Sequence, residues 1–322
     1  MAVSGDALIL AWHDGQVDAA AIGRAAQAMR EGAVVGMPTE TVYGLAARAR
    51  ERTDVARVFA IKGRPLDHPV IVHVGQPTAM RTWGRDVPEY AYALAEALWP
   101  GPLTLVVPAA DDVPRFVTGG QDTVGLRCPA HPVALALIDA VGPVAAPSAN
   151  RFGQVSPTRA SDVLADIGDR LGPHDLVLDG GDCPVGVEST ILDCTRPSPR
   201  VLRWGAVELS DVEAVTGQVD PGPSPIRAPG GLASHYAPRA RVHLSGTPRP
   251  GTGLLALADI ETPPGVHRLA APDTAREYAA VLYRALRDAD AAGLREVWAV
   301  PPESSDALST AIRDRLTRAA VR

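Results

Sequence analysis

The stretch Val34-Val-Gly-Met-Pro-Thr-Glu-Thr-Val-Tyr-Gly-Leu45 decides how the rest of this sequence is interpreted. Its first residues form a short apolar run, which is typical of a buried strand. Pro38 ends the run because proline has no N–H for a central sheet ladder. Helix-like sequence resumes near Ala46. Small hydroxyls at the carboxyl end of a strand are typical of ligand sites in open α/β sheets. On this stretch alone, Thr39 and Thr41 either form such a site or cap a helix.

Around this stretch, expected strands and helices alternate along the chain. An alanine-rich helix is expected between Asp18 as N-cap and Gly32 just past its end. Further helices are expected at residues 53–62, 88–99, 132–141 and 160–167. Strands are expected at residues 69–74, 103–107, 123–127, 143–146, 176–178, 190–193 and 200–203. This alternation predicts a mixed α/β sheet with helices against its faces.

A change of composition divides the chain of 322 residues, whose length suggests about two domains. Residues 220–231 hold four prolines and three glycines without apolar periodicity, which predicts a semi-rigid linker. Beyond it, strands at 253–258 and 296–300 and helices at 274–291 and 304–320 predict a small α/β domain. We therefore expect a first domain over residues 1–219, a linker over 220–239 and a second domain over 240–322.

Composition and missing motifs exclude several classes of protein. The net charge is −6 and no block of basic residues occurs, which argues against a protein built to grip a phosphate backbone. The N-terminus has no basic segment followed by a cleavage site, and no apolar run reaches the ~18 residues of a membrane span. The three cysteines form no C-x-x-C pair. Phosphate-loop, dinucleotide and zinc-protease motifs and a nucleophile elbow are also missing. A cytoplasmic protein is expected, with any nucleotide site of another type.

Two cations follow the expected helix at 53–62. Lys62 offers a point charge and Arg64 a planar fork, a combination that suits a polyphosphate or a phosphate plus a carboxylate. Cations at this position also complement a helix dipole, which is the simpler interpretation of Lys-Gly-Arg alone. Pro65 and Pro69 favour the ligand interpretation, because they fix an extended loop that no helix cap requires.

Two further polar residues lie in apolar strand sequence. His73 ends an Ile-Val-His run, and a lone strand histidine is more often structural than functional. Arg127 must pair with an anion or bear a desolvation cost. Its partner is either a structural carboxylate or the carboxylate of a ligand, and the sequence leaves both open. Small residues at 146–150 and a glycine-flanked acid and hydroxyls at 186–190 add weak signals of close ligand approach.

Taken together, these segments resemble the threonylcarbamoyl-AMP synthase family in its two-domain form. The matching motifs are Pro38-Thr-Glu-Thr-Val-Tyr-Gly-Leu45, Lys62-Gly-Arg-Pro65, Pro69-Val-Ile-Val-His-Val74, Trp99-Pro-Gly-Pro-Leu-Thr104, Arg127-Cys-Pro129, Ala146-Pro-Ser-Ala-Asn150, Val155-Ser-Pro-Thr158, Cys183-Pro-Val-Gly-Val-Glu-Ser-Thr190, Arg203-Trp-Gly-Ala206 and Ser234-His-Tyr-Ala-Pro238. They occur in the family's order over about residues 15–240, and residues 240–322 match only loosely.

The resemblance implies a fold and a reaction. It implies a YrdC-like catalytic domain, a twisted α/β mixed sheet with a large concave cavity, followed by a linker over the active site and a smaller Rossmann-like α/β domain. It also implies a nucleotidyltransferase that converts L-threonine, bicarbonate and ATP, with Mg²⁺, to L-threonylcarbamoyl-AMP, pyrophosphate and water. The product would serve a tRNA threonylcarbamoyl transferase that forms N6-threonylcarbamoyladenosine, and this enzyme itself would bind tRNA weakly or not at all.

By the same resemblance, residues are assigned to each substrate. The threonine site would comprise Thr41, His73, Arg127, the Ala146 main chain and Ser189. The ATP site would comprise Arg64, His68, Thr123, Ser148, Ser156, Arg203 and Tyr236. Lys62 and Arg64 would carry the catalytic charge, and no protein metal ligand is assigned.

Two departures from the family pattern stand out. His68 replaces the usual asparagine, and Leu232-Ala233-Ser234 replaces the usual Lys-Tyr-Arg, so basic help from that segment is missing. The alternatives are a carbamoyltransferase of the hydrogenase-maturation type, which shares the catalytic domain but carries further acylphosphatase and zinc-finger segments, and an RNA-binding module.

Overall fold

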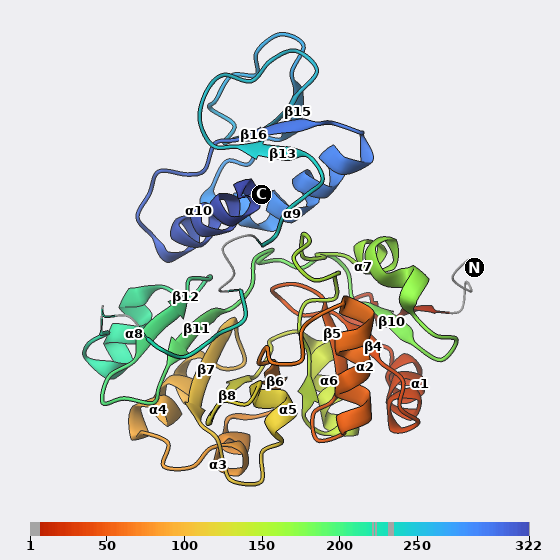
Figure 1. Cartoon of the computed structure of the whole chain (residues 1–322), viewed down its shortest axis with the longest axis vertical. Coiled ribbons are helices and arrows are strands. Elements are labelled where there is room, and N and C mark those ends of the chain that lie inside the picture. Colours follow the sequence, from red (N-terminus) through yellow and green to blue (C-terminus); the bar gives the residue numbers. More distant parts are fainter. Residues whose placement is uncertain (1–6, 221, 223, 231–234, 322) are drawn as a thin grey trace.

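The computed structural model of the chain describes residues 7–220, 222, 224–230 and 235–321. These residues form one large mixed sheet and one smaller parallel sheet, each with its own helices (Figure 1). The predicted α/β fold class, with a Rossmann-like second part, is therefore confirmed. The predicted division at residues 219/220 and 239/240 stays a prediction. Leu232-Ala233-Ser234 lie outside the described residues.

The large sheet contains ten strands among the described residues. Their spatial order is β1 (Leu8–Leu10), β10 (Leu176–Asp179), β4 (Val35–Met37), β5 (Gly44–Arg48), β9 (Val144–Ala145), β6 (Ile71–His73), β8 (Thr123–Arg127), β7 (Leu103–Pro108), β11 (Thr190–Asp193) and β12 (Arg200–Arg203). Parallel and antiparallel pairs both occur, for example β6 with β8 and β4 with β5. A separate hairpin, β2 (Trp12–His13) and β3 (Gln16–Val17), follows β1.

Helices cover the two faces of the large sheet unequally. One face packs against α2 (Arg52–Lys62), α3 (Met80–Trp83), α4 (Glu89–Leu98), α5 (Arg115–Thr118), α7 (Ala160–Ile167) and α8 (Leu209–Thr216). The opposite face packs against α1 (Ala19–Arg30) and α6 (Pro132–Val141), but only along β1, β10, β4, β5 and β9. Over β6, β7 and β11 this second face instead packs against linker residues such as Ile226 and Ala228. The helix-free part of the second face leaves room for a site.

Strand alternation sends chemically different residues to the two faces. In β6 and β8, Val72 and Leu126 belong to the helix-covered core, so their neighbours His73 and Arg127 point to the other face. A period of two along a strand therefore accounts for polar side chains within apolar strand sequence. These are the residues that the sequence left ambiguous between structural and ligand roles.

The expectation of helix near Ala46 is wrong. Residues Gly44–Arg48 form β5, which pairs antiparallel with β4 and then with β9. Alanine and leucine favour helix locally, but the turn at 38–43 reverses the chain beside β4. Ladder hydrogen bonds and burial of both faces then override local propensity. The other predicted helices and strands are confirmed, with shifts of one to a few residues at their ends.

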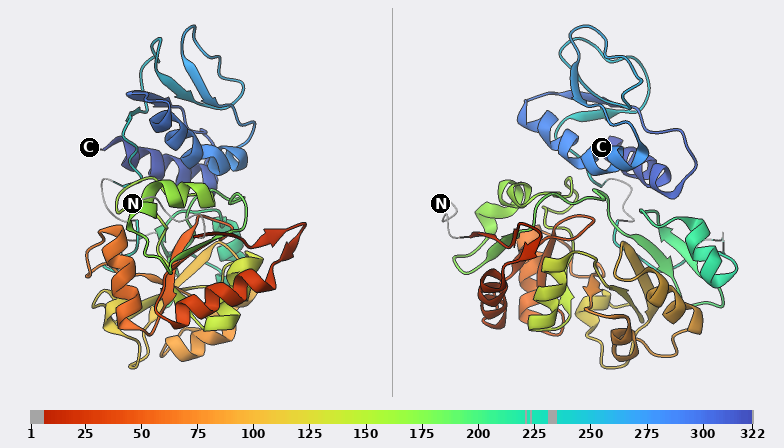
Figure 2. Two further views of the ribbon diagram at one scale, coloured as in Figure 1. Left: turned by 90° about the vertical axis from the view of Figure 1, so that its right-hand side faces the viewer. Right: turned by 180° about the vertical axis from the view of Figure 1, so that it is seen from behind.

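The small sheet is entirely parallel, in the order β13 (Arg241–His243), β16 (Glu296–Ala299), β14 (Gly253–Leu255) and β15 (His267–Ala270). Helices α9 (Ala275–Ala291) and α10 (Ala307–Ala320) lie between this sheet and the part built on the large sheet, as both views of Figure 2 show. A single apolar core joins them to Val42, Val155 and Val187 of that first part. Within the described residues, no helix is both long and apolar enough to cross a membrane.

Gly186 lies directly against the backbone of α9. Its φ is +77°, and a Cβ there would lie 2.2 Å from the Ala279 carbonyl oxygen and 2.4 Å from the Ala280 Cα. Gly181 on the same connection has a φ of +84°, and no described atom lies within 4 Å of the position that a Cβ would take there. Any other residue would therefore be strained at either position, and only at Gly186 would its Cβ also clash with α9.

Gly186→Ala should destabilise the protein more than Gly181→Ala. Both substitutions bear the cost of left-handed backbone, about 1–2 kcal/mol. Gly186→Ala additionally forces α9 away from the first part of the molecule, which adds about 1–3 kcal/mol. Urea unfolding of the two variants measures the difference. Equal losses of stability would show that α9 yields without cost at this point.

Candidate active site

A cavity opens on the helix-free face of the large sheet. It holds about 690 Å³ of space, partly open to solvent, and we call it the main cavity. Its polar wall comes from eight separate segments: the turn after β4, the end of α2, strands β6, β8 and β12, the loop after β9, the loop before β11, and the last part of the linker. These contribute Thr39, Thr41, Lys62, Arg64, His73, Arg127, Ser148, Asn150, Glu188, Ser189, Arg203, His235 and Tyr236.

The turn after β4 is held by its own hydroxyls. The Thr39 hydroxyl lies 2.6 Å from the Val42 carbonyl and 2.9 Å from Thr41 Oγ1, and the amides of Thr41 and Val42 donate to it. Arg127 Nη1 donates to Thr41 Oγ1 at 2.8 Å. Because each hydroxyl has one hydrogen to donate, Arg127 donates to Thr41, Thr41 donates to Thr39, and Thr39 donates to the Val42 carbonyl. Thr41 is left with a free lone pair, so it can accept a hydrogen bond from a ligand.

Arg127 already has a carboxylate partner. Its Nη2 lies 2.7 Å from Glu40 Oε1, and both side chains are almost fully buried. Glu40 Oε2 in turn accepts from the Ala130 amide at 3.1 Å. Of the two alternatives that the sequence left open, the structure contains the structural carboxylate. Tyr43 acts on the far side of the same turn, where its hydroxyl bridges the Gly181 carbonyl and the Gly180 amide.

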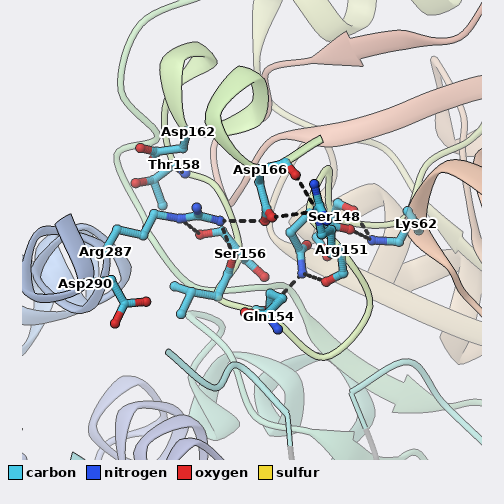
Figure 3. Close-up of polar contacts among 12 residues, drawn as sticks. Lys62, Ser148, Arg151, Gln154, Ser156, Thr158, Asp162, Asp166, Arg287 and Asp290 are labelled. Carbon is cyan, nitrogen blue, oxygen red and sulfur yellow. Dashed lines mark hydrogen bonds and ion pairs between the residues drawn. The ribbon is translucent and has the colours of Figure 1, made fainter. Parts of the chain in front are cut away.

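Lys62 ends α2 with its ammonium group inside the protein. Nζ donates to the carbonyls of Ser148 and Asn150, each at 2.5 Å, and the residue is 2% exposed (Figure 3). Burial, and then the nearby Arg64, lower the pKa of Lys62 well below its usual value. Lys62 is also the only lysine in a chain with thirty arginines. The sequence therefore uses lysine only where a compact point charge sits between two carbonyls.

Arg64 and Arg203 add positive charge to the wall. Arg64 donates to the Pro69 carbonyl at 2.8 Å, and burial together with Arg203 lowers its pKa to about 10. Arg203 donates to the backbone carbonyl and to the hydroxyl of Ser189, at 3.0 Å each, and to the Pro229 carbonyl of the linker. None of these contacts is to a carboxylate, so the guanidinium groups of Arg64 and Arg203 are available to an anionic ligand.

Several buried polar atoms of the wall have no hydrogen-bond partner among the described residues. They are Arg64 Nε, His73 Nδ1, Asn150 Oδ1, His235 Nδ1 and the Tyr236 hydroxyl. Burial lowers the pKa of His73 to about 3, with Arg127 adding to the effect, so its imidazole is neutral. Unpaired buried polar groups are costly and rare in native proteins. Their concentration around one cavity indicates a polar ligand that completes them.

A second cavity adjoins the first and shares Arg64, Phe152, Gly230 and His235 with it. We call it the side cavity. It holds about 1130 Å³ of space, partly open to solvent, and its lining includes the apolar residues Val201, Leu202 and Ile226. His68 lies on its wall and packs edge-on against Phe152, with ring centroids 5.3 Å apart. The two cavities together could hold a ligand with one highly charged and one planar end.

The predicted site residues mostly meet in this place. All of them line the main cavity except His68, Thr123 and Ser156. His68 lines the side cavity, and Thr123 lies beneath linker residues 227–229. Ser156 is fully buried behind the wall, where it donates to Glu188 Oε1 at 2.6 Å. The roles assigned to these residues stay predictions.

Some wall residues were not predicted, among them Glu188, Asn150, Phe152 and His235. Glu188 and His235 directly precede predicted residues, and Asn150 ends a predicted motif. Their position in the sequence was therefore the available signal. Among the described residues, no group of three or more His, Cys, Asp or Glu side chains could hold a metal ion. The three cysteines are free and buried, and burial raises the pKa of Cys128 to about 11. No thiolate nucleophile is therefore presented.

Comparison with known proteins gives a consistent result along the whole chain. The profile of the family described as "Telomere recombination" (Sua5_yciO_yrdC) matches residues 27–205, and that described as "Threonylcarbamoyl-AMP synthase, C-terminal domain" matches residues 207–321. A threonylcarbamoyl-AMP synthase of Pyrococcus abyssi is 44% identical over 233 residues, covering 70% of this chain and 68% of the relative. One of Bacillus subtilis is 43% identical, covering 68% and 65%. A crystal structure of P. abyssi Sua5 complexed with L-threonine superposes with a TM-score of 0.87 at 36% identity, covering 97% of each chain.

Proposed function

This chain belongs to the threonylcarbamoyl-AMP synthase family, and we propose that it converts L-threonine, bicarbonate and ATP to L-threonylcarbamoyl-AMP, pyrophosphate and water. The product serves the formation of N6-threonylcarbamoyladenosine in tRNA. The observation that carries the proposal is the near-complete superposition on a protein crystallised with L-threonine. The cluster of unpaired polar atoms around the main cavity supports it, because threonine and a triphosphate both need such partners.

We assign the threonine end to the wall formed by Thr41, His73, Arg127, Ala146 and Ser189. Zwitterionic threonine needs a cation for its carboxylate and acceptors for its amine. Arg127 supplies the cation, and Glu40 holds its guanidinium in place while neutralising part of its charge. The free lone pair of Thr41 suits an N–H or O–H donor rather than a carboxylate. This wall therefore orients the amine as well as the carboxylate.

We assign the phosphate end to Lys62, Arg64 and Arg203, and the nucleoside to the side cavity with His68. Threonine's amine takes up bicarbonate, with loss of water, to give a carbamate. A carbamate oxygen then attacks the α-phosphorus and pyrophosphate leaves. Catalysis by this chain consists of holding the two reactants in line and stabilising charge on the phosphates. It needs no protein nucleophile, which agrees with the buried, protonated cysteines.

We further propose that Mg²⁺ accompanies ATP and is held mainly by phosphate oxygens. The carboxylates nearest the cavity fit this assignment, because Glu40 is paired with Arg127 and both oxygens of Glu188 accept hydrogen bonds. When bound, the ion would offset phosphate charge during departure of pyrophosphate. A cytoplasmic location and delivery of the product to a tRNA threonylcarbamoyl transferase are also proposals.

Pyrophosphate release with each component left out in turn tests the reaction. Release should need ATP, L-threonine and bicarbonate together, because the carbamate is the attacking group. The adenylate should appear by mass spectrometry in step with pyrophosphate. Release that persists without threonine, or without bicarbonate, would exclude the proposed reaction and favour simple hydrolysis of ATP to AMP and pyrophosphate.

A further inference from the structure

Glu188 is a cavity-wall carboxylate whose contacts come from both parts of the molecule. Its Oε1 accepts from the Ser156 hydroxyl at 2.6 Å. Its Oε2 accepts from Tyr283 of α9 at 2.8 Å and from Arg315 Nε of α10 at 3.0 Å. Burial alone would raise the pKa of Glu188, but Arg315, Arg203 and the hydroxyl bonds outweigh it and hold this pKa at about 2. The carboxylate is therefore charged and fully engaged.

Arg315 reaches the catalytic part without lining either cavity. Arg315 is 1% exposed. In addition to its contact with Glu188, it donates through Nη2 to the Trp204 carbonyl at 2.9 Å. Asp314 pairs with Nη1 at 2.9 Å and so fixes the fork from the other side. Because its donors are all held by partners, the guanidinium has one orientation, and it holds the Glu188 carboxylate in place.

Arg315 also supports Tyr236, a wall residue near the end of the linker. Its guanidinium lies 5.3 Å from the Tyr236 ring centroid, and Tyr283 stacks on the same ring at 5.7 Å. Tyr236 has a φ of +60°, a strained conformation that persists only where the surroundings fix it. Two neighbouring wall residues, Glu188 and Tyr236, thus depend on one arginine of α10.

A second arginine of the C-terminal part holds the segment behind the wall. Arg287 of α9 donates to the carbonyls of Val155 and Ser156 and pairs with Asp166 at 3.2 Å (Figure 3). Ser156 therefore has its backbone fixed by α9 and its hydroxyl fixed by a carboxylate that α10 orients. The geometry of this side of the cavity is set from outside the catalytic sheet.

We propose that Arg315 is a positioning residue for the nucleotide site. Acting through Glu188 and Tyr236, it holds the part of the main-cavity wall that these two residues form in the shape that accepts ATP. The inference rests on the proposed function for the identity of the nucleotide. It assigns α10 a role in substrate affinity that goes beyond packing the second part of the molecule against the first.

Steady-state kinetics of Arg315→Met and Arg315→Lys in the full-length protein tests this role. In metal sites, loss of a residue that holds a direct ligand in place typically lowers affinity or activity by about 10- to 100-fold, and we expect a similar effect here. The KM for ATP should rise by about that factor in Arg315→Met, and the KM for threonine by much less. Arg315→Lys keeps the charge but has a single donor group, so it should recover part of the ATP affinity.

Arg313→Met is the matched control. Arg313 also lies on α10, but its donors contact Pro302, Ser304 and Thr310 within the C-terminal part. Its KM values should stay within about twofold of wild type, as for surface changes remote from a site. An ATP KM in folded Arg315→Met equal to that of Arg313→Met overturns the proposal. If Arg315→Met does not fold, Arg315→Lys decides, and a wild-type ATP KM there overturns it.

The test separates this inference from the reaction itself. A wild-type protein that releases no pyrophosphate refutes the proposed function and leaves the nucleotide site to be measured by binding. In that case ATP should still raise the thermal unfolding midpoint of wild type and Arg313→Met, and raise it less in Arg315→Lys at the same ATP concentration. Equal shifts in all three proteins overturn the positioning role.

Discussion

Lys62→Arg should lower the rate of pyrophosphate release by about 100-fold or more, the loss typical of removing one preorganised charge donor. The substitution keeps the formal charge, so a general electrostatic role would predict a mild effect. Nζ, however, sits between two carbonyls at 2.5 Å in a place that is 2% exposed. A guanidinium is planar and larger, and cannot occupy that place without displacing the loop that carries Ser148.

Arg57→Lys provides the matched control for this exchange. Arg57 lies on the same helix α2, is partly exposed, and pairs with Asp175 at 2.5 Å on the side away from the cavity. Its replacement should leave the rate within about twofold of wild type. Circular dichroism at the assay temperature checks that both proteins are folded. A Lys62→Arg enzyme with the wild-type rate would mean that charge alone, and not its placement, is needed there.

Arg127→Met should strongly weaken the use of threonine and also destabilise the protein. Removing one partner of a buried pair typically costs about 3–5 kcal/mol, because Glu40 is left charged and unpaired. The KM for threonine should rise by about 100-fold or more through loss of the carboxylate's partner, a charge-assisted contact. The KM for ATP should change far less, because Arg64 and Arg203 belong to the other end of the cavity.

The double variant Glu40→Gln/Arg127→Met separates the two effects. Removing both charges relieves the unpaired carboxylate, so chemical unfolding should show most of the lost stability restored. Threonine affinity should not return, because the cation for its carboxylate is still missing. If threonine affinity returns with stability, Arg127 acts only by maintaining the fold. Equal increases in the KM for threonine and ATP would show that its ligand is misassigned.

Local sequence predicted those parts of the fold that local interactions decide. Asp18 caps α1 by accepting from the amides of Ala20 and Ala21, and Gly63 ends α2 in left-handed conformation. Both follow from the chemistry of single residues. By contrast, β5 was expected to be helical, because its alanines favour helix and nothing in the segment indicates that β4 and β9 lie on either side. The short strands β1, β13 and β15 were missed because three or four residues carry too little pattern.

The sequence predicted which residues line the site, but not which of them contact one another. The family resemblance placed Lys62, Arg127 and Ser189 at one site, and all three line the main cavity, while their roles stay predictions. The partner of Arg127 could not be predicted, because Glu40 is remote in sequence and a ligand carboxylate satisfies the same electrostatic need. Arg315 gave no signal at all. An arginine on an amphipathic helix is usually solvated, and only its contact with Glu188, 127 positions away, distinguishes it.

The dependence of Tyr236 and Glu188 on α10 also fixes when the enzyme can first become active during its synthesis. A ribosome synthesises the large sheet, whose strand β12 ends at Arg203, before it reaches Arg315. Until then every residue proposed to touch substrate already exists, yet the part of the main-cavity wall formed by Glu188 and Tyr236 lacks its support. A premature stop codon just before this arginine would leave a protein with an intact set of substrate contacts and an unformed nucleotide site.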